Sequence, residues 1–357
     1  MRLLFLFFCF YNNLIFSQDY YVYVAAESDD QVSLIKFDGE KAIELKKINV
    51  GKWPAENEGP HGITVDPNGK YWYLTLAHGN PYGTLYKFST ETNEVVGETK
   101  LGIFPASMQI SVATGLLYCV NFNLHGKMEP SSVSVVDPEE MIEIKKITTG
   151  SMPHGSRISP DGLFQYSVAM MSDELFEIDA ISLKVNRVLS LENKMDHSSV
   201  NHTMHNSMKH YSSVKPTWVI PHPSKKIVYI AGNGSNEIIE VNLEEWFVSD
   251  RFKTGKGPYN VEITPNGKFL LATLKGEGST AIWNTEDNTL VKIIKNSTTV
   301  SHGIAISSDN KFAFISLEGV GGEPGVVDVI NLEKFELVSS VNVGKQAGGI
   351  AFWKISD

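Results

Sequence analysis

Histidine is the residue type in this chain whose spacing most clearly suggests chemistry. Three of the ten histidines, His61, His154 and His302, lie between a proline or serine and a glycine, in the segments PHG, PHG and SHG. His78 and His125 also precede a glycine. Imidazole nitrogens bind copper, zinc, iron and nickel, and three histidines that leave a position open form a common catalytic or labile metal site.

A second group of possible ligands lies in one segment, about residues 194–214, with the sequence KMDHSSVNHTMHNSMKHYSSV. Its candidate ligands are His197, His202, His205, His210 and Met204. Imidazole and thioether ligands together suit copper, especially its reduced state. The segment is also compatible with a polar loop, because it has no apolar period. A single histidine in a turn is, likewise, more often a hydrogen-bonding residue than a metal ligand.

A repeated unit must position these residues. The stretch GPHGITVDPNGK at residues 59–70 recurs in five further copies, and a trace of a seventh ends the chain. The equivalent positions are Pro60, Pro105, Pro153, Pro216, Pro258, Ser301 and Ala347. They are separated by 45, 48, 63, 42, 43 and 46 residues, and the long step contains the 194–214 insertion. A period in the forties with four short strands per copy is typical of propeller blades.

The repeat predicts an all-β fold, a seven-bladed β-propeller with four-stranded antiparallel blades over residues 18–357. In the first blade, for example, YWYLTLA, TLYKFST and EVVGETKLG follow the inner strand. Three N-terminal strands lack an inner strand, and GGIAFWKI at the C-terminus supplies it. We therefore expect the last blade to be closed by both ends of the chain, which leaves no free sheet edge.

The register of the repeat places nine of the ten histidines on one face, which we call the top face. The start of each inner strand and the loop between the second and third strands both lie on it. His61, His154 and His302 begin the inner strands of blades one, three and six, which are spaced nearly as a triangle around the ring. His78 and His125 are in second-to-third loops, the insertion joins the same face, and His222 lies opposite.

Several segments carry a resemblance to a known family: SPDG at 159–162, TPNGK at 264–268, SVSVVD at 132–137 and VNVG at 341–344. The chain resembles the YVTN family of seven-bladed propellers over nearly all of residues 19–357. The PHG segments are also similar to those of the nitrous oxide reductase propeller, whose axial histidines hold a copper–sulfide cluster. That resemblance implies copper ligands at His61, His154 and His302.

The resemblance to the reductase has limits. Nothing in the chain matches the reductase's C-terminal cupredoxin domain. The remaining blades have Ala106, Thr217, Tyr259 and Gly348 in the position of the PHG histidine. Nitrous oxide reduction is therefore not expected.

The first 17 residues, MRLLFLFFCFYNNLIFS, predict a secretory signal peptide that is cleaved before Gln18, and an uncleaved anchor is the alternative. We therefore expect a periplasmic, secreted or cell-surface protein with no transmembrane segment after cleavage. Cys119 is then the only cysteine, so no internal disulfide is expected. The net charge of −10 without a basic block argues against nucleic-acid binding. We expect a monomer.

These features predict an exported propeller that binds a transition metal, with copper favoured, and serves in redox chemistry or metal handling. The alternative is a non-catalytic propeller whose top face binds a protein, peptide or glycan. A third hypothesis is a lactonase-like hydrolase with a divalent ion at axial carboxylates, for which Glu262, Glu318 and Asp173 are candidates. Glu262 is expected as a polar residue of an inner strand, and Glu318 and Asp173 as solvated loop charges. No nucleophile elbow, HExxH, phosphate loop or CxxCH motif is present.

Overall fold

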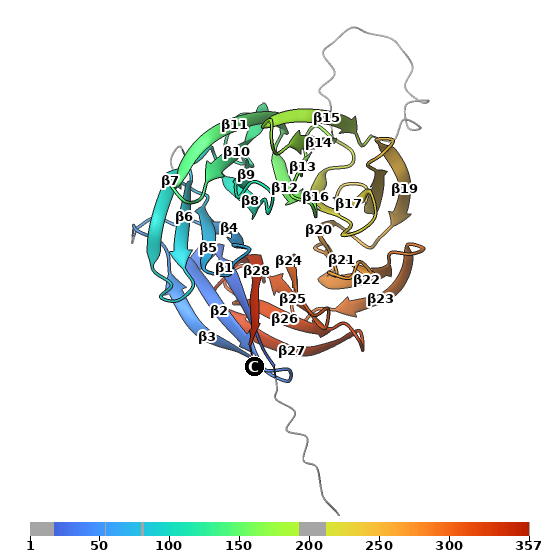
Figure 1. Cartoon of the computed structure of the whole chain (residues 1–357). Coiled ribbons are helices and arrows are strands. Elements are labelled where there is room, and N and C mark those ends of the chain that lie inside the picture. The colour runs from blue at the N-terminus through green and yellow to red at the C-terminus, as the bar shows by residue number, and fades with distance from the viewer. Residues whose placement is uncertain (1–17, 54, 80–81, 193–211, 357) are drawn as a thin grey trace, which may run out of the picture.

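Seven four-stranded antiparallel sheets stand around a central axis, as the repeat predicts (Figure 1). The computed structural model describes residues 18–53, 55–79, 82–192 and 212–356. The predicted signal peptide at 1–17 and most of the insertion, residues 193–211, lie outside the described residues.

Each strand has one of four places in its blade, and the order below runs from blade one to blade six and then to the closing blade. The inner strands are β4 (Pro60–Val65), β8 (Pro105–Ile110), β12 (Pro153–Ile158), β16 (Pro216–Pro221), β20 (Pro258–Ile263), β24 (Ser301–Ile306) and β28 (Ala347–Ser356). The second strands are β5 (Tyr71–Leu76), β9 (Leu117–Asn121), β13 (Phe164–Ala169), β17 (Ile227–Gly232), β21 (Phe269–Leu274), β25 (Phe312–Leu317) and β1 (Asp19–Ala26).

The outer half of each blade follows the same order. The third strands are β6 (Thr84–Ser89), β10 (Pro130–Asp137), β14 (Glu174–Asp179), β18 (Glu237–Asn242), β22 (Ser279–Asn284), β26 (Gly325–Asn331) and β2 (Gln31–Phe37). The outer strands are β7 (Val95–Lys100), β11 (Ile142–Ser151), β15 (Lys184–Ser190), β19 (Phe247–Lys253), β23 (Thr289–Lys295), β27 (Glu336–Val343) and β3 (Ala42–Asn49). A short 3₁₀ helix, η1 (Glu27–Asp29), follows β1.

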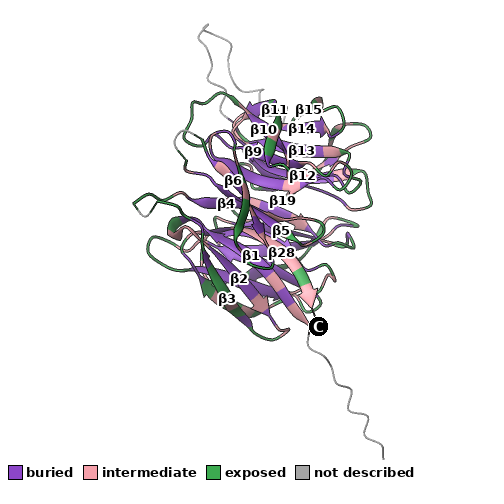
Figure 2. Cartoon of the chain, turned by 60° about the vertical axis from the view of Figure 1, so that its left-hand side comes forward, coloured by how far each residue is buried: buried purple, intermediate pink, exposed green. Residues whose placement is uncertain are grey.

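Burial explains why the sequence forms these strands. The second and third strands are buried on both faces, between neighbouring blades, and read as nearly continuous apolar runs such as LYCVN in β9. The outer strands alternate or are exposed, as in β15, and Figure 2 shows exposed residues on β3 at the rim. The core is therefore distributed among clusters between adjacent blades and does not occupy the axis.

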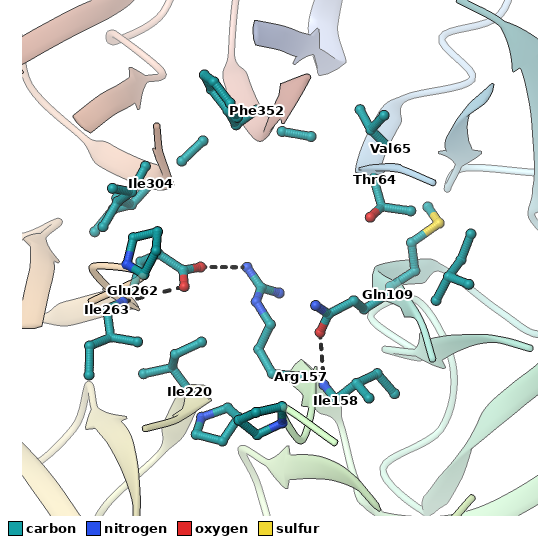
Figure 3. A pocket seen from close by; sticks show the side chains of 18 of the residues that line it. Thr64, Val65, Gln109, Arg157, Ile158, Ile220, Glu262, Ile263, Ile304 and Phe352 are labelled. Carbon is teal, nitrogen blue, oxygen red and sulfur yellow. Dashed lines mark hydrogen bonds and ion pairs between the residues drawn. The ribbon is translucent and has the colours of Figure 1, made fainter. Parts of the chain in front are cut away.

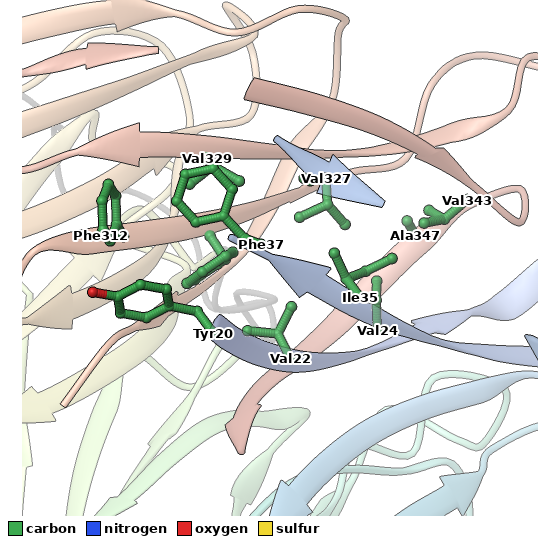
Figure 4. Close-up of a cluster of buried hydrophobic side chains, with 12 residues drawn as sticks. Tyr20, Val22, Val24, Ile35, Phe37, Phe312, Val327, Val329, Val343 and Ala347 are labelled. Carbon is green, nitrogen blue, oxygen red and sulfur yellow. The ribbon is translucent and has the colours of Figure 1, made fainter. Parts of the chain in front are cut away.

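The ring closes as the sequence predicts, because β28 pairs with β1 in one sheet with β2 and β3. The closing blade packs against blade six through a buried aromatic group (Figure 4). Phe37 lies with its ring centroid 4.9 Å from that of Phe312 and 6.2 Å from that of Phe314. The two chain ends are thus joined by strand pairing and by apolar packing.

A repeated backbone feature at the start of the inner strands is not evident from the sequence. The residue before each inner strand has a positive φ, between 47° and 63°. These residues are Gly59, Phe104, Met152, Lys215, Gly257, Val300 and Gln346. The first residues of every inner strand also form a bulge against the second strand, as between Pro60 and Ile63. Such bulges re-aim side chains, and here they turn the second residue of each inner strand toward the axis.

The glycine that follows each of the three histidines is required by packing. A Cβ on Gly62 would lie 1.8 Å from the carbonyl oxygen of Ala106 in the next blade. A Cβ on Gly303 would lie 2.7 Å from the carbonyl oxygen of Gly348. The PHG pattern therefore combines a glycine that allows neighbouring inner strands to approach with a histidine that faces the axis.

Buried hydroxyl groups link the bulge of one blade to the inner strand of the next. The Thr273 hydroxyl accepts a hydrogen bond from the backbone N–H of Asn260 at 3.0 Å and donates to the carbonyl oxygen of His302 at 2.8 Å. Ser316 makes the same bridge from Gly303 to Gly348, at 2.9 and 2.5 Å. The inner strands of blades five and six, and of blade six and the closing blade, are therefore held in a fixed register at the top face.

None of the helices among the described residues has the length and apolar character that crossing a bilayer requires.

The packing at the closing blade yields a stability prediction. Phe37→Ala should lower the free energy of unfolding by about 3–5 kcal/mol, because it leaves a cavity between two blades. Urea denaturation followed by tryptophan fluorescence measures the effect. Leu45→Ala on the exposed edge of β3 is the control and should change stability by less than about 0.5 kcal/mol. Equal effects of the two substitutions would contradict this account of closure.

Candidate functional site

The three histidines of the PHG and SHG segments come together at the top-face end of the axis. The ring centroid of His61 lies 6.2 Å from that of His154 and 6.1 Å from that of His302. His154 and His302 are buried, and the side chain of His61 is 12% exposed. Each is the second residue of its inner strand, so the bulge described above sets its direction.

A carboxylate from the closing blade joins this cluster. Glu27, in η1 directly after β1, lies 2.8 Å from Nδ1 of His61 and 3.0 Å from Nε2 of His78. Burial by itself would raise the pKa of Glu27, but the hydrogen bonds and charges of the two imidazoles outweigh it and hold that pKa well below its ordinary value. The hydrogen bond to Glu27 in turn raises the pKa of His78.

His154 has both ring nitrogens occupied by protein groups. Its Nδ1 donates to the carbonyl oxygen of Thr217 at 2.9 Å, so its Nε2 accepts from the Tyr259 hydroxyl, also at 2.9 Å. Burial lowers the pKa of His154 to about 3, and the nearby His61 adds to the effect. His154 is therefore neutral in the folded protein at neutral pH.

His302 is buried and incompletely hydrogen bonded. Its Nδ1 has no partner among the described residues, and its Nε2 is 3.6 Å from a carboxylate oxygen of Glu318. The same Glu318 oxygen accepts from Lys275 at 2.7 Å, and the Lys275 ammonium lies 4.3 Å from the centre of the Tyr259 ring. Burial, followed by the charge of Lys275, lowers the pKa of His302 well below its ordinary value.

The other two predicted top-face histidines lie beside this cluster. The ring centroid of His78 is 5.6 Å from that of His125, and both rings contact Phe104, which also contacts His61. His125 is exposed and lies in the loop after β9. His197, His202, His205, His210 and Met204 lie outside the described residues.

Two further side chains of this cluster, Tyr259 and Glu27, were not among the sequence candidates. Tyr259 occupies, in blade five, the same strand position as the three histidines, so the register alone places it on the axis. Glu27 follows the second strand of the closing blade, as His78 does in blade one. Extending the loop comparison to the closing blade would have identified it.

The three carboxylates of the lactonase hypothesis do not form a shared site. Among the described residues, no group of three His, Cys, Asp or Glu side chains is arranged to hold a metal ion. The expectation that Asp173 is solvated is wrong, because it is fully buried. Its carboxylate accepts hydrogen bonds from the Ser212 hydroxyl and from the backbone N–H of Ser213 and Lys215. Asp173 therefore anchors the chain where the insertion ends.

The axial cluster meets part of what a metal site needs. The contact with Glu27 makes Nδ1 of His61 a donor and leaves its Nε2 without a hydrogen bond among the described residues, the arrangement in which a carboxylate orients a metal-binding imidazole. The unpartnered Nδ1 of His302 is a second available nitrogen. His154 is available only if Tyr259 releases its Nε2.

Comparison with solved structures supports the fold. A chain of the hydrazine synthase of Kuenenia stuttgartiensis aligns with a TM-score of 0.65 and 18% identity, over 84% of this chain and 93% of that chain. A functionally unknown protein from Desulfotomaculum acetoxidans DSM 771 aligns with a TM-score of 0.69 and 15% identity, over 93% and 98%. No family model and no curated protein sequence matches the chain. Identities this low show a shared propeller fold alone.

The ion pairs of Glu27 predict how stability depends on pH in the metal-free protein. The lowered pKa of Glu27 gives stability that is present above its unfolded value of 4.5 and is lost as pH falls through the folded value. The raised pKa of His78 gives stability that is present below its unfolded value of 6.5 and is lost as pH rises through the folded value. Glu27→Gln should therefore destabilise most between these two values, as thermal unfolding across pH will measure.

Glu98→Gln is the matched control, because the Glu98 carboxylate pairs with Lys52 on the exposed surface. Its effect should be small across the same range. A Glu27→Gln protein whose loss of stability is the same at pH 5.5 and pH 9 would contradict the assignment.

Proposed function

We propose that the chain is an exported propeller, related to the YVTN repeats, that binds a transition metal ion at the top-face end of its axis. The observation that carries the proposal is the contact between Glu27 and Nδ1 of His61 at 2.8 Å. A carboxylate that fixes one imidazole nitrogen presents the other nitrogen, in the right tautomer, to a metal. His61 Nε2 and His302 are the first two ligands, and His154 is the third once the Tyr259 hydroxyl turns away.

The protonation states of the cluster favour this role. Metal ions bind neutral imidazole, so a histidine that is already neutral loses no proton when the metal arrives. Burial keeps the pKa values of His154 and His302 low, while Glu27 supplies a compensating negative charge beside His61. The cluster is thus suited to receive a cation in a poorly hydrated site.

Copper is the metal that the donor types favour. Imidazole alone suits copper, zinc, iron and nickel, and the interleaved methionines of the 194–214 segment add the soft ligands that reduced copper prefers. The described end of this segment, Ser212 and Ser213, hydrogen bonds to Met170 and Asp173 in the second-to-third loop of blade three, on the top face. The corresponding role is redox chemistry or the storage and transfer of the metal.

Metal binding by His61 and His302 can be tested on protein purified without a histidine tag. Wild-type protein loaded with copper and dialysed should retain a stoichiometric amount by elemental analysis, and the His61→Ala/His302→Ala variant should retain little. Glu27→Gln should weaken the affinity by about 10–100-fold, as loss of an orienting carboxylate does.

His222→Gln is the control for this experiment. His222 lies in a turn after β16 at the opposite face, where its Nδ1 accepts backbone hydrogen bonds from Ser224 and Lys225. That variant should keep the wild-type metal content. Low and equal metal in the wild-type and double-variant proteins would refute the proposal.

Export is part of the same proposal. Strand β1 begins at Asp19, so cleavage before Gln18 would leave the closing blade intact. N-terminal sequencing of protein recovered from the periplasm or medium should begin at Gln18. Recovery of the full-length chain from the cytoplasm alone would refute export.

A second candidate function is the binding of a protein partner, and exposed apolar residues on the top-face loops favour it. Trp53 is 64% exposed, Tyr82 53% and Met128 63%, in the connections before β4, after β5 and after β9. In this case, Trp53→Ser/Tyr82→Ser should abolish capture of a purified candidate partner, whereas the double histidine variant should retain it. The opposite pattern would favour the metal site.

A further inference from the structure

A cavity lies at the end of the axis opposite the histidine cluster, and neither the repeat nor the histidine pattern predicts it. It has a volume of about 440 Å³ and is lined by the ends of all seven inner strands, from β4 to β28. Pockets of about 300–1,000 Å³ are typical of small-molecule sites. Figure 3 looks into this cavity, which we call the bottom funnel.

The bottom funnel has a polar side and an apolar side. The fifth residue of every inner strand lines it: Thr64, Gln109, Arg157, Ile220, Glu262, Ala305 and Ala351. The polar members belong to blades one, two, three and five. Blade six and the closing blade contribute the alanines, so the apolar side of the funnel has open space. Its walls are Ile304, Ile306 and Phe352.

An ion pair reaches across the polar side. The Nη2 of Arg157 lies 3.1 Å from Oε2 of Glu262, two blades away, and each side chain is only 17% exposed. The Arg157 guanidinium also lies 5.0 Å from the centre of the Trp218 ring. Apolar residues of similar size would hold blades together as well as a buried pair does, because desolvation offsets most of the attraction. A charged pair kept in a cavity therefore points to a ligand.

The pair and its neighbour have hydrogen-bonding capacity to spare. Arg157 uses Nη1 for the Ser156 carbonyl oxygen, and its Nε has no partner among the described residues. Gln109 accepts from the Ile158 N–H at 2.8 Å, which leaves its amide N–H groups without a partner there. In Figure 3 that amide faces the Arg157 guanidinium.

The negative charge of Glu262 is only partly compensated. Arg157 pairs with its Oε2, and among the described residues its Oε1 receives a single hydrogen bond, from the backbone N–H of Ile263 at 3.3 Å. Burial raises the pKa of Glu262, and Arg157 offsets this only in part. Donors for an anion and an acceptor for a cation thus lie side by side.

We propose that the bottom funnel binds a free α-amino acid with an apolar side chain. Arg157 and Gln109 hold the carboxylate, Glu262 holds the ammonium group, and the side chain lies over Ala305 and Ala351 toward Phe352. A zwitterion fits because the ion pair has no net charge, so a ligand with one charge of each sign keeps the cavity neutral. In an α-amino acid the ammonium and carboxylate groups are attached to the same carbon atom. They can therefore reach Glu262 and Arg157, which are in contact with each other.

Isothermal titration calorimetry on the purified full chain tests the ligand class, with L-leucine as the probe. The comparison ligands are 4-methylpentanoate, which lacks the ammonium group, 3-methylbutylamine, which lacks the carboxylate, and glycine, which lacks the side chain. Each should bind at least about ten-fold more weakly than L-leucine, the effect expected when a hydrogen bond to a charged group or a buried apolar group is lost. Absence of L-leucine binding, or equal binding of 4-methylpentanoate, overturns the proposal.

Two near-isosteric variants separate a ligand site from a structural ion pair. Gln109→Glu keeps the oxygen that accepts from Ile158 but repels a carboxylate, so L-leucine binding should fall at least about ten-fold. Gln31→Glu, on the strand β2 away from the axis, is the matched control and should bind normally. Glu262→Gln should weaken L-leucine and strengthen 4-methylpentanoate, because the Arg157 guanidinium then lacks its carboxylate partner. Unchanged L-leucine affinity in Gln109→Glu, with circular dichroism showing a folded protein, overturns the assignment.

Discussion

The hydroxyl bridges between neighbouring inner strands are the interaction on which the rest of the structure depends. Thr273 and Ser316 each satisfy a bulge N–H in their own blade and donate to the next blade, in the case of Thr273 to the carbonyl oxygen of His302. These groups are buried, so a missing partner would cost about 1–3 kcal/mol. At these two junctions the bridges fix how far one inner strand advances past the next. The direction in which the axial side chains point follows from that register.

The arrangement of the charged and titratable groups at the top face depends in part on closure of the ring. Glu27, the carboxylate that balances His61 and His78, belongs to the N-terminal part of the chain, while His302 belongs to the last complete blade. The rings of His61 and His302, with centroids 6.1 Å apart, lie on either side of the closing blade and come together only when β28 has paired with β1. The low-polarity environment around His154 and His302 comes from the blades between them, because blade four supplies Trp218 beside His154 and blade five supplies Tyr259, which contacts both histidines. An open ring would therefore separate His302 from His61.

The sequence predicted the blade count, the closing blade and the convergence of three histidines, because all three follow from the period and register of one repeated unit. It did not identify the partners of those histidines. Glu27 is near His61 through a contact 34 residues apart, and Arg157 meets Glu262 across 105 residues, distances over which a repeat carries no pairing information. Asp173 was misjudged because burial of a loop carboxylate depends on backbone N–H groups that arrive from the far side of the insertion. Local pattern determines where a side chain points, and tertiary packing determines what it meets.

The residue before each inner strand has a left-handed backbone conformation, and this makes the fold independent of the side chains at the axis. The same backbone turn occurs before His61, Ala106 and Gly348, so it does not depend on the side chain that follows. Seven positions thus share one backbone conformation, and the side chains of four of them, His61, His154, Tyr259 and His302, meet at the axis. Ala106 and Gly348 are the smallest residues at these positions. A Cβ added at Gly348 would lie 3.6 Å from the His302 ring, an ordinary van der Waals contact. An axis of this kind can acquire or lose donor groups one blade at a time while the ring of blades around it is preserved.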